Sequence, residues 1–504
     1  MLKGLIIIAE INISGITFAY DGSYENVFEN VHLSIDTNWK LGLSGRNGRG
    51  KTTLLRLLAG QLAYRGKITA PCNFTYFPFD VDKSRLTKSI IGDFGDFTAT
   101  HPHSDWQLTR ELNLLEVTED ALHRPFDTLS GGEQTKVMLA ALFLRENNFL
   151  LIDEPTNHLD IHGRELVSRY LSGKSGFILV SHDRYFLDGC VSHILSINKA
   201  NIEVMRGNFS TWLENKQRQD NFELAENQKL KREIVRLEKS AREKADWSEN
   251  VESSKIGKNA VRDIGWRSYA GEKSRKMMKS SKVIEKRQQR AIEEKSNLLK
   301  NIETVDDLKI FPQKYHAKTL VRLRDVGISY GDKAVCNDIT FTIETGDRIA
   351  ICGANGSGKS SIIKLICGES LQHTGEVHVG SGLKISYISQ DTSHLTGNLW
   401  DFCRDNGLDA SLMLAMLRKL DFRREQFDIA MQNFSAGQKK KVLIAKSLLE
   451  KAHLLIWDEP LNYIDVLSRI QIENLILRHC PTILFVEHDG AFLDKIATSR
   501  IRLP

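Results

Sequence analysis

Gly45-Arg-Asn-Gly-Arg-Gly50-Lys51-Thr52 stands between a strand-like apolar run at residues 41–44 and an apolar helix start at residues 54–58. Glycines in a turn between a strand and a helix let backbone N–H groups close around phosphate groups. In this pattern Lys51 reaches the β- and γ-phosphate oxygens, and the hydroxyl of Thr52 holds Mg²⁺. The stretch therefore predicts an α/β domain that binds a nucleoside triphosphate with Mg²⁺.

Three further motifs follow this loop in a fixed order. Leu129-Ser-Gly-Gly-Glu-Gln134 comes first, one apolar strand then ends in Asp153-Glu154, and another ends in Ser181-His182-Asp183. A strand that delivers Asp and then Glu supplies a Mg²⁺ ligand and, beside it, a carboxylate that orients or activates the attacking water. A single His182 is more typical of a structural histidine, but within this ordered set we expect it to contact the γ-phosphate. The nucleotide is expected to be ATP, because Tyr20 can stack on adenine and no Asn-Lys-x-Asp guanine motif is present.

The same series recurs in the second half of the chain. Tyr330 precedes Gly353-Ala-Asn-Gly-Ser-Gly358-Lys359-Ser360, and then follow Phe434-Ser-Ala-Gly-Gln438, Asp458-Glu459 and Glu487-His488-Asp489. In both halves 23 residues separate the serine of the second motif from the aspartate of the third. Repetition of the whole series at such spacings indicates an internal duplication. We predict nucleotide-binding domains at residues 1–206 and 319–504.

Residues 207–318 lie between the two repeats and are rich in charge. Their apolar positions recur at helical spacing on the way out and every seven residues on the way back: Leu230, Ile234, Leu237, Ala241 and Ala245, then Met277, Ile284, Ala291, Leu298 and Val305. This pattern predicts a helical hairpin linker with one apolar seam on each arm. Arms of roughly 40 residues would extend about 60 Å at 1.5 Å per residue.

The predicted tip of the hairpin concentrates the basic charge. Between Lys255 and Arg290 stand twelve Lys and Arg against three acidic residues, a net charge of +9, whereas the whole chain carries only +5. Trp247, Trp266 and Tyr269 are interleaved with these charges. Cations that meet phosphates and rings that stack on bases are what a nucleic-acid-binding loop requires. Two alternatives stay open, a solvated coiled coil whose charges only keep it soluble and a surface for anionic lipid.

The length of 504 residues is enough for two or three domains, each with its own core. No segment approaches the length of a membrane helix, and the apolar run at residues 5–9 is too short for a signal peptide. The seven cysteines are scattered and lack the close Cys/His pairing of metal sites. We therefore expect a cytoplasmic protein without a membrane domain.

The duplicated series resembles the ATP-binding cassette superfamily, for which the Ser-Gly-Gly-Glu motif at residues 130–133 is close to diagnostic. Two cassettes on one chain with a charged helical linker look like the ABC-F class of translation factors. Within that class the sequence is most similar to the Lsa-type ribosomal protection proteins at residues 37–50, 222–227 and 456–465. The resemblance implies an α/β fold of two tandem ATP-binding cassettes of the P-loop NTPase type, joined by a long α-helical hairpin.

The function implied by this resemblance is antibiotic resistance. Members of the group confer resistance to lincosamides, streptogramin A compounds and pleuromutilins. A monomeric chain would close its two cassettes head to tail around two ATP molecules and reopen them on hydrolysis. The partner would be the 70S ribosome, where the linker tip would enter the tRNA exit site and reach toward the peptidyl-transferase centre in 23S rRNA. P-site tRNA would be displaced and, indirectly, the drug.

The resemblance also implies the site residues. Glu154 and Glu459 would be the catalytic carboxylates, and His182 and His488 the switch histidines. Mg²⁺ would be held by Thr52, Asp153, Ser360, Gln390 and Asp458. The two ATP molecules would be contacted by loop residues of both repeats and by the serine motif of the opposite one: Tyr20, Gly45, Asn47, Gly48, Gly50, Lys51, Thr52, Thr53, Ser435 and Gly437 for one, and Tyr330, Gly353, Asn355, Gly356, Gly358, Lys359, Ser360, Ser361, Gln390, Ser130, Gly131 and Gly132 for the other.

Two positions depart from the family pattern. Gln390 stands where the family has a glutamine that contacts Mg²⁺ and water, but the first repeat has Phe79 at the matching place. Ala436 replaces a glycine of the second serine motif. Both changes concern the site that contains Lys51, whose full activity is thereby in question.

Three other functions compete with ribosomal protection. A housekeeping ABC-F translation regulator would share every motif described. The ATPase subunit of a transporter would leave the long hairpin without a role. A DNA-acting ATPase of the repair type usually carries zinc-binding cysteines, which this sequence lacks.

Overall fold

The computed structural model describes residues 9–22, 26–94, 104–145, 147–157, 159–198, 201–253, 310, 312–331 and 333–503, with helical residues at intervals between 272 and 290. The chain divides into two compact units. The first, here the double-repeat unit, comprises Met1–Ile197, Ile202–Ser210 and Val305–Pro504, and the second, the linker unit, comprises Asn198–Asn201 and Thr211–Thr304. Each unit is described by itself.

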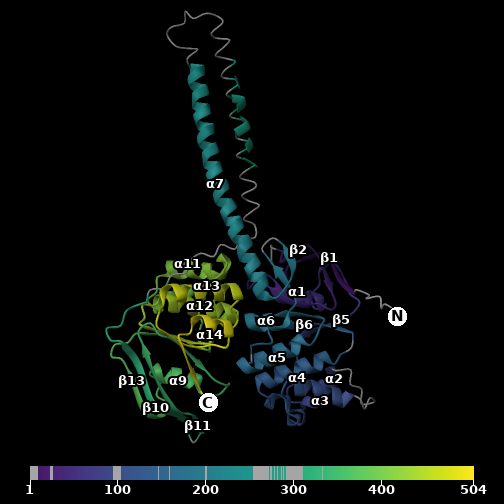
Figure 1. The fold of residues 1–504 in the computed structure, drawn as a ribbon, viewed down its shortest axis with the longest axis vertical. Coiled ribbons are helices and arrows are strands. Elements are labelled where there is room, and N and C mark those ends of the chain that lie inside the picture. The colour runs from purple at the N-terminus through teal and green to yellow at the C-terminus, as the bar shows by residue number, and fades with distance from the viewer. Residues whose placement is uncertain are drawn as a thin grey trace, which may run out of the picture. The chain divides into compact units, whose positions relative to one another are not determined.

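The first repeat alternates strands and helices along the chain (Figure 1). Its strands are β1 (Glu10–Phe18), β2 (Phe28–Asp36), β3 (Lys40–Ser44), β4 (Arg65–Thr69), β5 (Asn73–Phe77), β6 (Asn148–Asp153), β7 (Phe177–Val180), β8 (His193–Ile197) and β9 (Ile202–Arg206). Its helices are α1 (Lys51–Leu58), α2 (Thr87–Phe94), α3 (Ser104–Leu114), α4 (Gly131–Phe143), α5 (Ile161–Ser172) and α6 (Arg184–Cys190). A six-stranded sheet has the order β5-β6-β7-β3-β8-β9, and an antiparallel sheet has the order β2-β1-β4.

The second repeat has the same plan. Its strands are β10 (Thr319–Tyr330), β11 (Lys333–Glu344), β12 (Arg348–Cys352), β13 (Gln372–Val379), β14 (Ile385–Ile388), β15 (Leu454–Asp458), β16 (Ile483–Val486) and β17 (Ser499–Arg502). Its helices are α9 (Lys359–Ile366), α10 (Leu399–Asp405), α11 (Ala410–Lys419), α12 (Ala436–Leu449), α13 (Val466–His479) and α14 (Gly490–Ile496). The five strands β14-β15-β16-β12-β17 are parallel, and the antiparallel sheet has the order β11-β10-β13.

The parallel strands lie between two apolar layers. On one face Ile362, Ile363 and Ile366 of α9 pack with the antiparallel sheet, and on the other face α10 to α14 supply a second core around Trp457. Strands buried on both faces need continuous apolar residues, which is why β7 and β16 read Phe-Ile-Leu-Val and Ile-Leu-Phe-Val. The predicted α/β fold is therefore confirmed.

The sheet order brings the predicted motifs together. Strands β6, β7 and β3 are neighbours, and their carboxyl ends lead into Asp153-Glu154, into residues 181–183 and into the glycine loop. Strands β15, β16 and β12 do the same for the second repeat. In open α/β sheets ligands bind outside the carboxyl ends of the strands, so each repeat presents its polar motifs at one such edge.

The linker unit contains most of helix α7 (Phe209–Ser253), which is 45 residues long, slightly longer than the predicted arm (Figure 1). Leu230, Ile234 and Leu237 are half-buried along it, as an apolar seam requires. On the return arm Ile284 is buried, whereas Val283, Lys286 and Arg287 are exposed. Of the predicted tip from Lys255 to Arg290, residues 255–271 lie outside the described residues, and so do the positions Met277, Ala291, Leu298 and Val305.

Candidate functional site

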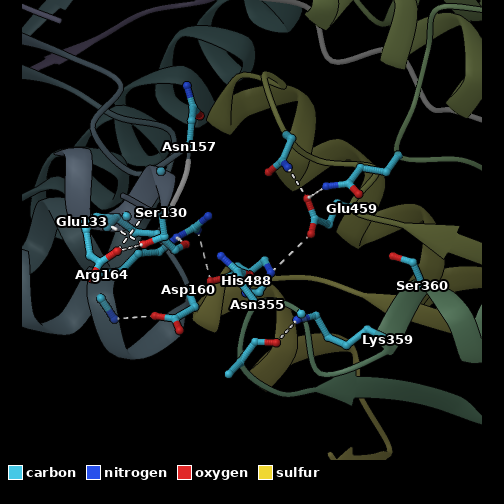
Figure 2. Close-up of a pocket in the computed structure, with 18 of the residues that line it drawn as sticks. Ser130, Glu133, Asn157, Asp160, Arg164, Asn355, Lys359, Ser360, Glu459 and His488 are labelled. Carbon is cyan, nitrogen blue, oxygen red and sulfur yellow. Dashed lines mark hydrogen bonds and ion pairs between the residues drawn. The ribbon is translucent and has the colours of Figure 1, made fainter. Parts of the chain in front are cut away.

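Two cavities in the double-repeat unit each combine a glycine loop of one repeat with the serine motif of the other. The Lys51 cavity, of about 470 Å³, is lined by Lys51 and Thr52 and by Ser435 to Gly437. The Lys359 cavity, of about 710 Å³, is lined by Lys359 and Ser360 and by Ser130 to Gly132. Figure 2 shows Ser130 and Glu459 on opposite sides of the Lys359 cavity. Both cavities therefore need both repeats.

The last glycine of each loop is required by its backbone. Gly50 and Gly358 have φ angles of 91° and 92°, in the left-handed region, and both cap the following helix. A Cβ atom on Gly50 would lie 2.7 Å from Val27 Cγ1, and one on Gly358 would lie 2.9 Å from Val335 Cγ1. Each loop can therefore turn into its helix only with glycine at this place.

The loop lysines are buried and held by main-chain oxygens. Lys51 Nζ donates to the oxygen of Gly45 at 2.7 Å, and Lys359 Nζ donates to those of Gly353 and Ala354 at 2.9 and 2.8 Å. Burial lowers the pKa of both ammonium groups, and neighbouring carboxylates oppose that shift. The ammonium groups of the two lysines are thus held within the glycine loops, where an anionic ligand would contact them.

The hydroxyl after each lysine meets the aspartate of the third motif. Thr52 Oγ1 donates to Asp153 Oδ2 at 2.8 Å, and a hydrogen bond from Ser360 lowers the pKa of Asp458, which burial raises more strongly. Asp458 Oδ1 is buried without a hydrogen-bond partner in the part of the chain that the structure describes. A cation would satisfy that oxygen, so the residues fit Mg²⁺.

No group of three or more His, Cys, Asp and Glu is placed to hold a metal ion among the described residues. Mg²⁺ commonly uses one or two carboxylates together with substrate phosphates and water rather than an all-protein cage.

Glu459 is held by three side chains. Gln390 Nε2 and Asn462 Nδ2 donate to its Oε2 at 2.9 and 2.8 Å, and His488 Nε2 lies 3.4 Å from its Oε1 (Figure 2). Burial opposes ionisation, but the hydrogen bond and charge of His488, with Lys440 and Lys359, lower the pKa of Glu459. The second repeat thus presents an ionised, oriented carboxylate.

Glu154 lies in a different environment. Burial, reinforced by the charge of Asp153, raises its pKa to about 8. His182 Nε2 lies 3.3 Å from Glu154 Oε1, but that buried oxygen has no hydrogen bond of suitable geometry. The pKa is therefore shifted in opposite directions at the two matching glutamates, and only Glu459 accepts hydrogen bonds from two side-chain amides.

Each serine motif begins a helix. Ser130 accepts from the backbone N–H of Glu133 at the start of α4, and Ser435 accepts from that of Gln438 at the start of α12. Both form capping boxes, which fix the first turn of these helices of 13 and 14 residues. Their N-terminal ends open on the cavities, and the positive end of a helix favours an anion.

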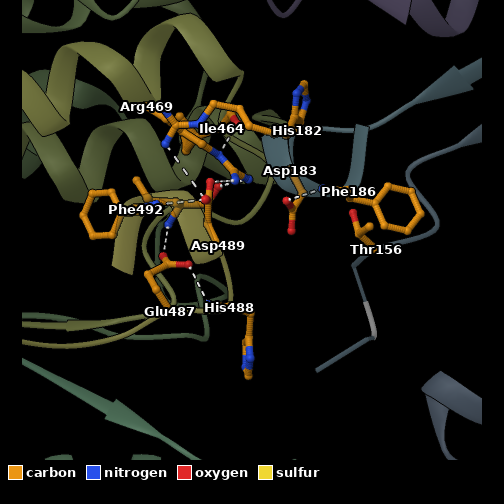
Figure 3. A network of polar contacts seen from close by, with 12 residues as sticks. Thr156, His182, Asp183, Phe186, Ile464, Arg469, Glu487, His488, Asp489 and Phe492 are labelled. Carbon is orange, nitrogen blue, oxygen red and sulfur yellow. Dashed lines mark hydrogen bonds and ion pairs between the residues drawn. The ribbon is translucent and has the colours of Figure 1, made fainter. Parts of the chain in front are cut away.

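A buried polar network joins the loops that follow β7 and β16 (Figure 3). Arg164 Nη1 donates to Asp183 Oδ2 at 3.0 Å and to the main-chain oxygen of His488 at 3.1 Å. Arg469 Nη1 donates to Asp489 Oδ2 at 2.8 Å. Burial and the nearby charge of Asp489 raise the pKa of Asp183. Two carboxylates thus share a buried region that the two arginines stabilise.

Most residues predicted for nucleotide or metal contact line the two cavities, including Tyr20, Asn47, Gly48, Thr53 and Glu154 in one and Asn355, Gly356, Ser361, Gln390 and His488 in the other. Gly45 and Gly353 lie behind them, as acceptors for the lysines. Tyr330 contacts Ser361 through its hydroxyl at 3.2 Å, as Tyr20 contacts Thr53 at 2.8 Å.

Several lining residues were not among the predicted ones. Asn157, Asp160 and Arg164 line the Lys359 cavity, and Tyr463 lines the Lys51 cavity, where its main-chain oxygen accepts from Asn47 Nδ2 at 2.9 Å. Asn157, Asp160 and Tyr463 belong to the polar loops that follow each Asp-Glu pair, and Arg164 lies in α5, directly after the first of these loops. The signal was present in the sequence, because these loops recur at the same place in both repeats.

A family model described as ABC transporter matches residues 28–157 and 336–462, which covers the glycine loops and the Asp-Glu strands of both repeats. The chain belongs to the ABC transporter family. With two cassettes on one chain it is an ATPase of the ABC-F class.

Relatives of this cassette protein match nearly its whole length. It is 28% identical to the ribosome protection protein VmlR of Bacillus subtilis over 487 residues, 96% of this chain and 85% of VmlR. It is 26% identical to the energy-dependent translational throttle protein EttA of Escherichia coli over 523 residues, 94% of this chain and 88% of EttA. It is 27% identical to the ATP-binding protein Uup of Buchnera aphidicola (Acyrthosiphon pisum) over 490 residues, 94% of this chain and 77% of Uup.

Solved structures agree on the fold. The archaeal ribosome recycling factor aABCE1, in complex with the stalk protein aP1, superimposes with a TM-score of 0.61 at 18% identity, covering 97% of this chain and 87% of that one. A structure of RNase-L inhibitor gives 0.60 at 18% identity, with the same coverage. The predicted tandem cassette architecture is therefore confirmed. Within the described residues, no helix is both long and apolar enough to cross a membrane.

Proposed function

We propose that this ABC-F ATPase is a cytoplasmic ribosome protection factor, which relieves translation from lincosamides, streptogramin A compounds and pleuromutilins. The similarity to VmlR over 96% of the chain is the observation that carries the proposal. The linker sequence supports it, since a net charge of +9 between Lys255 and Arg290 suits contact with ribosomal RNA. In this account the linker tip acts near the peptidyl-transferase centre and displaces P-site tRNA.

The cassettes would close on two ATP molecules and reopen on hydrolysis. Lys51 and Lys359 would bind the β- and γ-phosphates, and the starts of α12 and α4 would complete each site from the other cassette. Glu459 would orient the attacking water and His488 would position Glu459. Mg²⁺ would be held by Ser360, Asp458 and Gln390, and Thr52 with Asp153 would serve the first site. Bound Mg²⁺ neutralises charge on the transferring phosphoryl group.

The test is the drug susceptibility of a sensitive host that expresses the chain. We expect higher resistance to lincomycin, a streptogramin A and a pleuromutilin, and none from the Glu154→Gln/Glu459→Gln variant at equal expression. Unchanged susceptibility with the wild-type chain present at normal levels would overturn the proposal.

A housekeeping role in translation is the second candidate, and the similarity to EttA over 94% of the chain favours it. A deletion strain would then show altered polysome profiles with unchanged drug susceptibility. A transport role would require a membrane partner, which affinity purification of the full chain from detergent-solubilised membranes would recover.

A further inference from the structure

The two ATP sites differ in the residues around the attacking water. In the Lys359 cavity the amides of Gln390 and Asn462 converge on one oxygen of Glu459, at 2.9 and 2.8 Å. Both amides line that cavity. A carboxylate held by two donors has one orientation, and its second oxygen, which lies 3.4 Å from His488 Nε2, can still accept a hydrogen bond from a water molecule.

Neither amide has a counterpart at Glu154. Phe79 takes the place of Gln390, but it lines a separate cavity with Arg56, Tyr76 and Arg145 rather than the Lys51 cavity. A phenyl ring can neither donate a hydrogen bond nor hold a metal. Asn157, which matches Asn462, lines the Lys359 cavity instead. In the described part of the chain, no side-chain amide donates a hydrogen bond to Glu154.

The metal positions differ too. Asp153 Oδ2 accepts hydrogen bonds from Thr52 at 2.8 Å and also from the Tyr76 hydroxyl at 2.9 Å. Asp458 instead keeps a buried oxygen without a hydrogen-bond partner among the described residues. The Tyr76 hydroxyl thus uses part of the acceptor capacity of Asp153, whereas Asp458 in the other site keeps one oxygen for a cation.

The elements expected to bind the triphosphate are nevertheless present around the Lys51 cavity. Lys51, the glycine loop and the start of α12 from the other cassette all line it, and Tyr20 stands beside it. Asn47 Nδ2 also joins the two cassettes there through the main-chain oxygen of Tyr463, at 2.9 Å. This site can hold a triphosphate although it lacks the two amides that orient the matching glutamate in the other site.

We propose that the Lys51 site keeps its ATP intact through many cycles, while the Lys359 site hydrolyses ATP. The rate of hydrolysis at the Lys359 site then determines how often the cassettes open. At the Lys359 site the water oxygen bonds to the γ-phosphorus as the bond to the β–γ bridging oxygen breaks. The water gives its proton to Glu459, and ADP and phosphate leave. The retained ATP holds Asn47 and Tyr463 together, so only one site opens fully. This inference rests on the ATPase of the proposed function but needs neither a ribosome nor a drug.

The experiment measures which nucleotide stays bound. The full-length chain is cycled with Mg²⁺ and ATP labelled at the α-phosphate, passed through a desalting column, quenched in acid, and its ATP and ADP are separated. We expect about one ATP retained per chain. Lys51→Ala should lose it, whereas Lys359→Ala should keep it. Retained ADP, or retention that depends on Lys359 instead of Lys51, would overturn the proposal.

A gain-of-function variant provides the second measurement. Phe79→Gln supplies an amide at the position that matches Gln390. Because the side chain at position 79 lines the neighbouring cavity, the glutamine must turn toward Glu154, and the retained nucleotide should then become ADP at least about tenfold faster than in the wild-type chain. Phe79→Leu is the matched control and should leave ATP intact. Conversion at equal rates in both variants would contradict the role of Phe79. If the chain gives no drug resistance but still retains one ATP, the proposed ribosomal function is wrong, whereas the proposed difference between the two ATP sites is supported.

Discussion

The Arg164 guanidinium in the first cassette donates a hydrogen bond to the main-chain oxygen of His488 in the second, at 3.1 Å, and pairs with Asp183 at 3.0 Å. One arginine therefore supports its own cassette and contacts the residue that lies beside Glu459. Arg469, at the matching position, bonds only within its own cassette in the hydrogen bonds of the described residues, to Asp489, Ile464 and Leu461. This hydrogen bond across the cassettes thus runs from the first repeat to the Lys359 site.

We expect Arg164→Met to destabilise the protein by about 3 kcal/mol, because it leaves the buried Asp183 without its cation. Urea denaturation measures this loss. Arg169→Met, an exposed change on the same helix, is the control and should stay within about 0.5 kcal/mol. Equal effects of the two variants would show that Arg164 does not stabilise the network.

An ion pair across the cassettes joins Arg184 of α6 to Glu473 of α13, whose side chain is fully buried. Arg184→Glu should cost about 3 kcal/mol of unfolding free energy, since it places two carboxylates together. The double variant Arg184→Glu/Glu473→Arg restores opposite charges and should recover at least part of that loss. Urea denaturation of the single and double variants gives the coupling energy, and a coupling near zero would mean that the pair is not specific.

The glycine loop offers a matched pair of alanine variants. In Gly50→Ala the alanine would have a left-handed φ of 91°, and its Cβ would lie 2.7 Å from Val27 Cγ1. In Gly48→Ala the alanine would have a left-handed φ of 81°, but its Cβ would point into open space. Strain alone should cost about 1–2 kcal/mol at Gly48. Overpacking should add about 1–3 kcal/mol at Gly50. Thermal unfolding of both variants tests the order, and a less stable Gly48→Ala would contradict this account of the loop.

Gln390→Ala should lower kcat for ATP by about 100-fold with little change in KM, because Glu459 loses one of the two amides that orient it. Steady-state phosphate release gives both constants. Gln432→Ala, an exposed glutamine of the same cassette, is the control. A change confined to KM would assign Gln390 to ATP binding rather than to water positioning.

The duplicated motifs made most of both sites predictable. A strand, glycine loop and helix at residues 41–58 and 349–366 fix a parallel α/β sheet, and the motif order places Asp153, Glu154 and His182 at one edge of it. The sequence also predicted the helical spacing of Leu230, Ile234 and Leu237 in α7.

Contacts between the cassettes were less accessible to sequence reasoning. Asn157 lines the opposite cassette's site, and Arg164 reaches a main-chain oxygen 324 residues away. Such contacts depend on how two folded surfaces meet, which local spacing does not encode. The opposite pKa shifts of Glu154 and Glu459 likewise arise from burial and from partners distant in the sequence.

Cell-free translation on purified ribosomes tests the central claim most directly. Lincomycin is added until reporter synthesis stops, and the full-length chain is then supplied with ATP. The account predicts that the wild-type chain restores synthesis and that the Glu154→Gln/Glu459→Gln variant, which stays closed on ATP, inhibits synthesis even without the drug. Continued inhibition by lincomycin with wild-type chain in excess over ribosomes, together with no effect of the double variant, would contradict ribosomal protection.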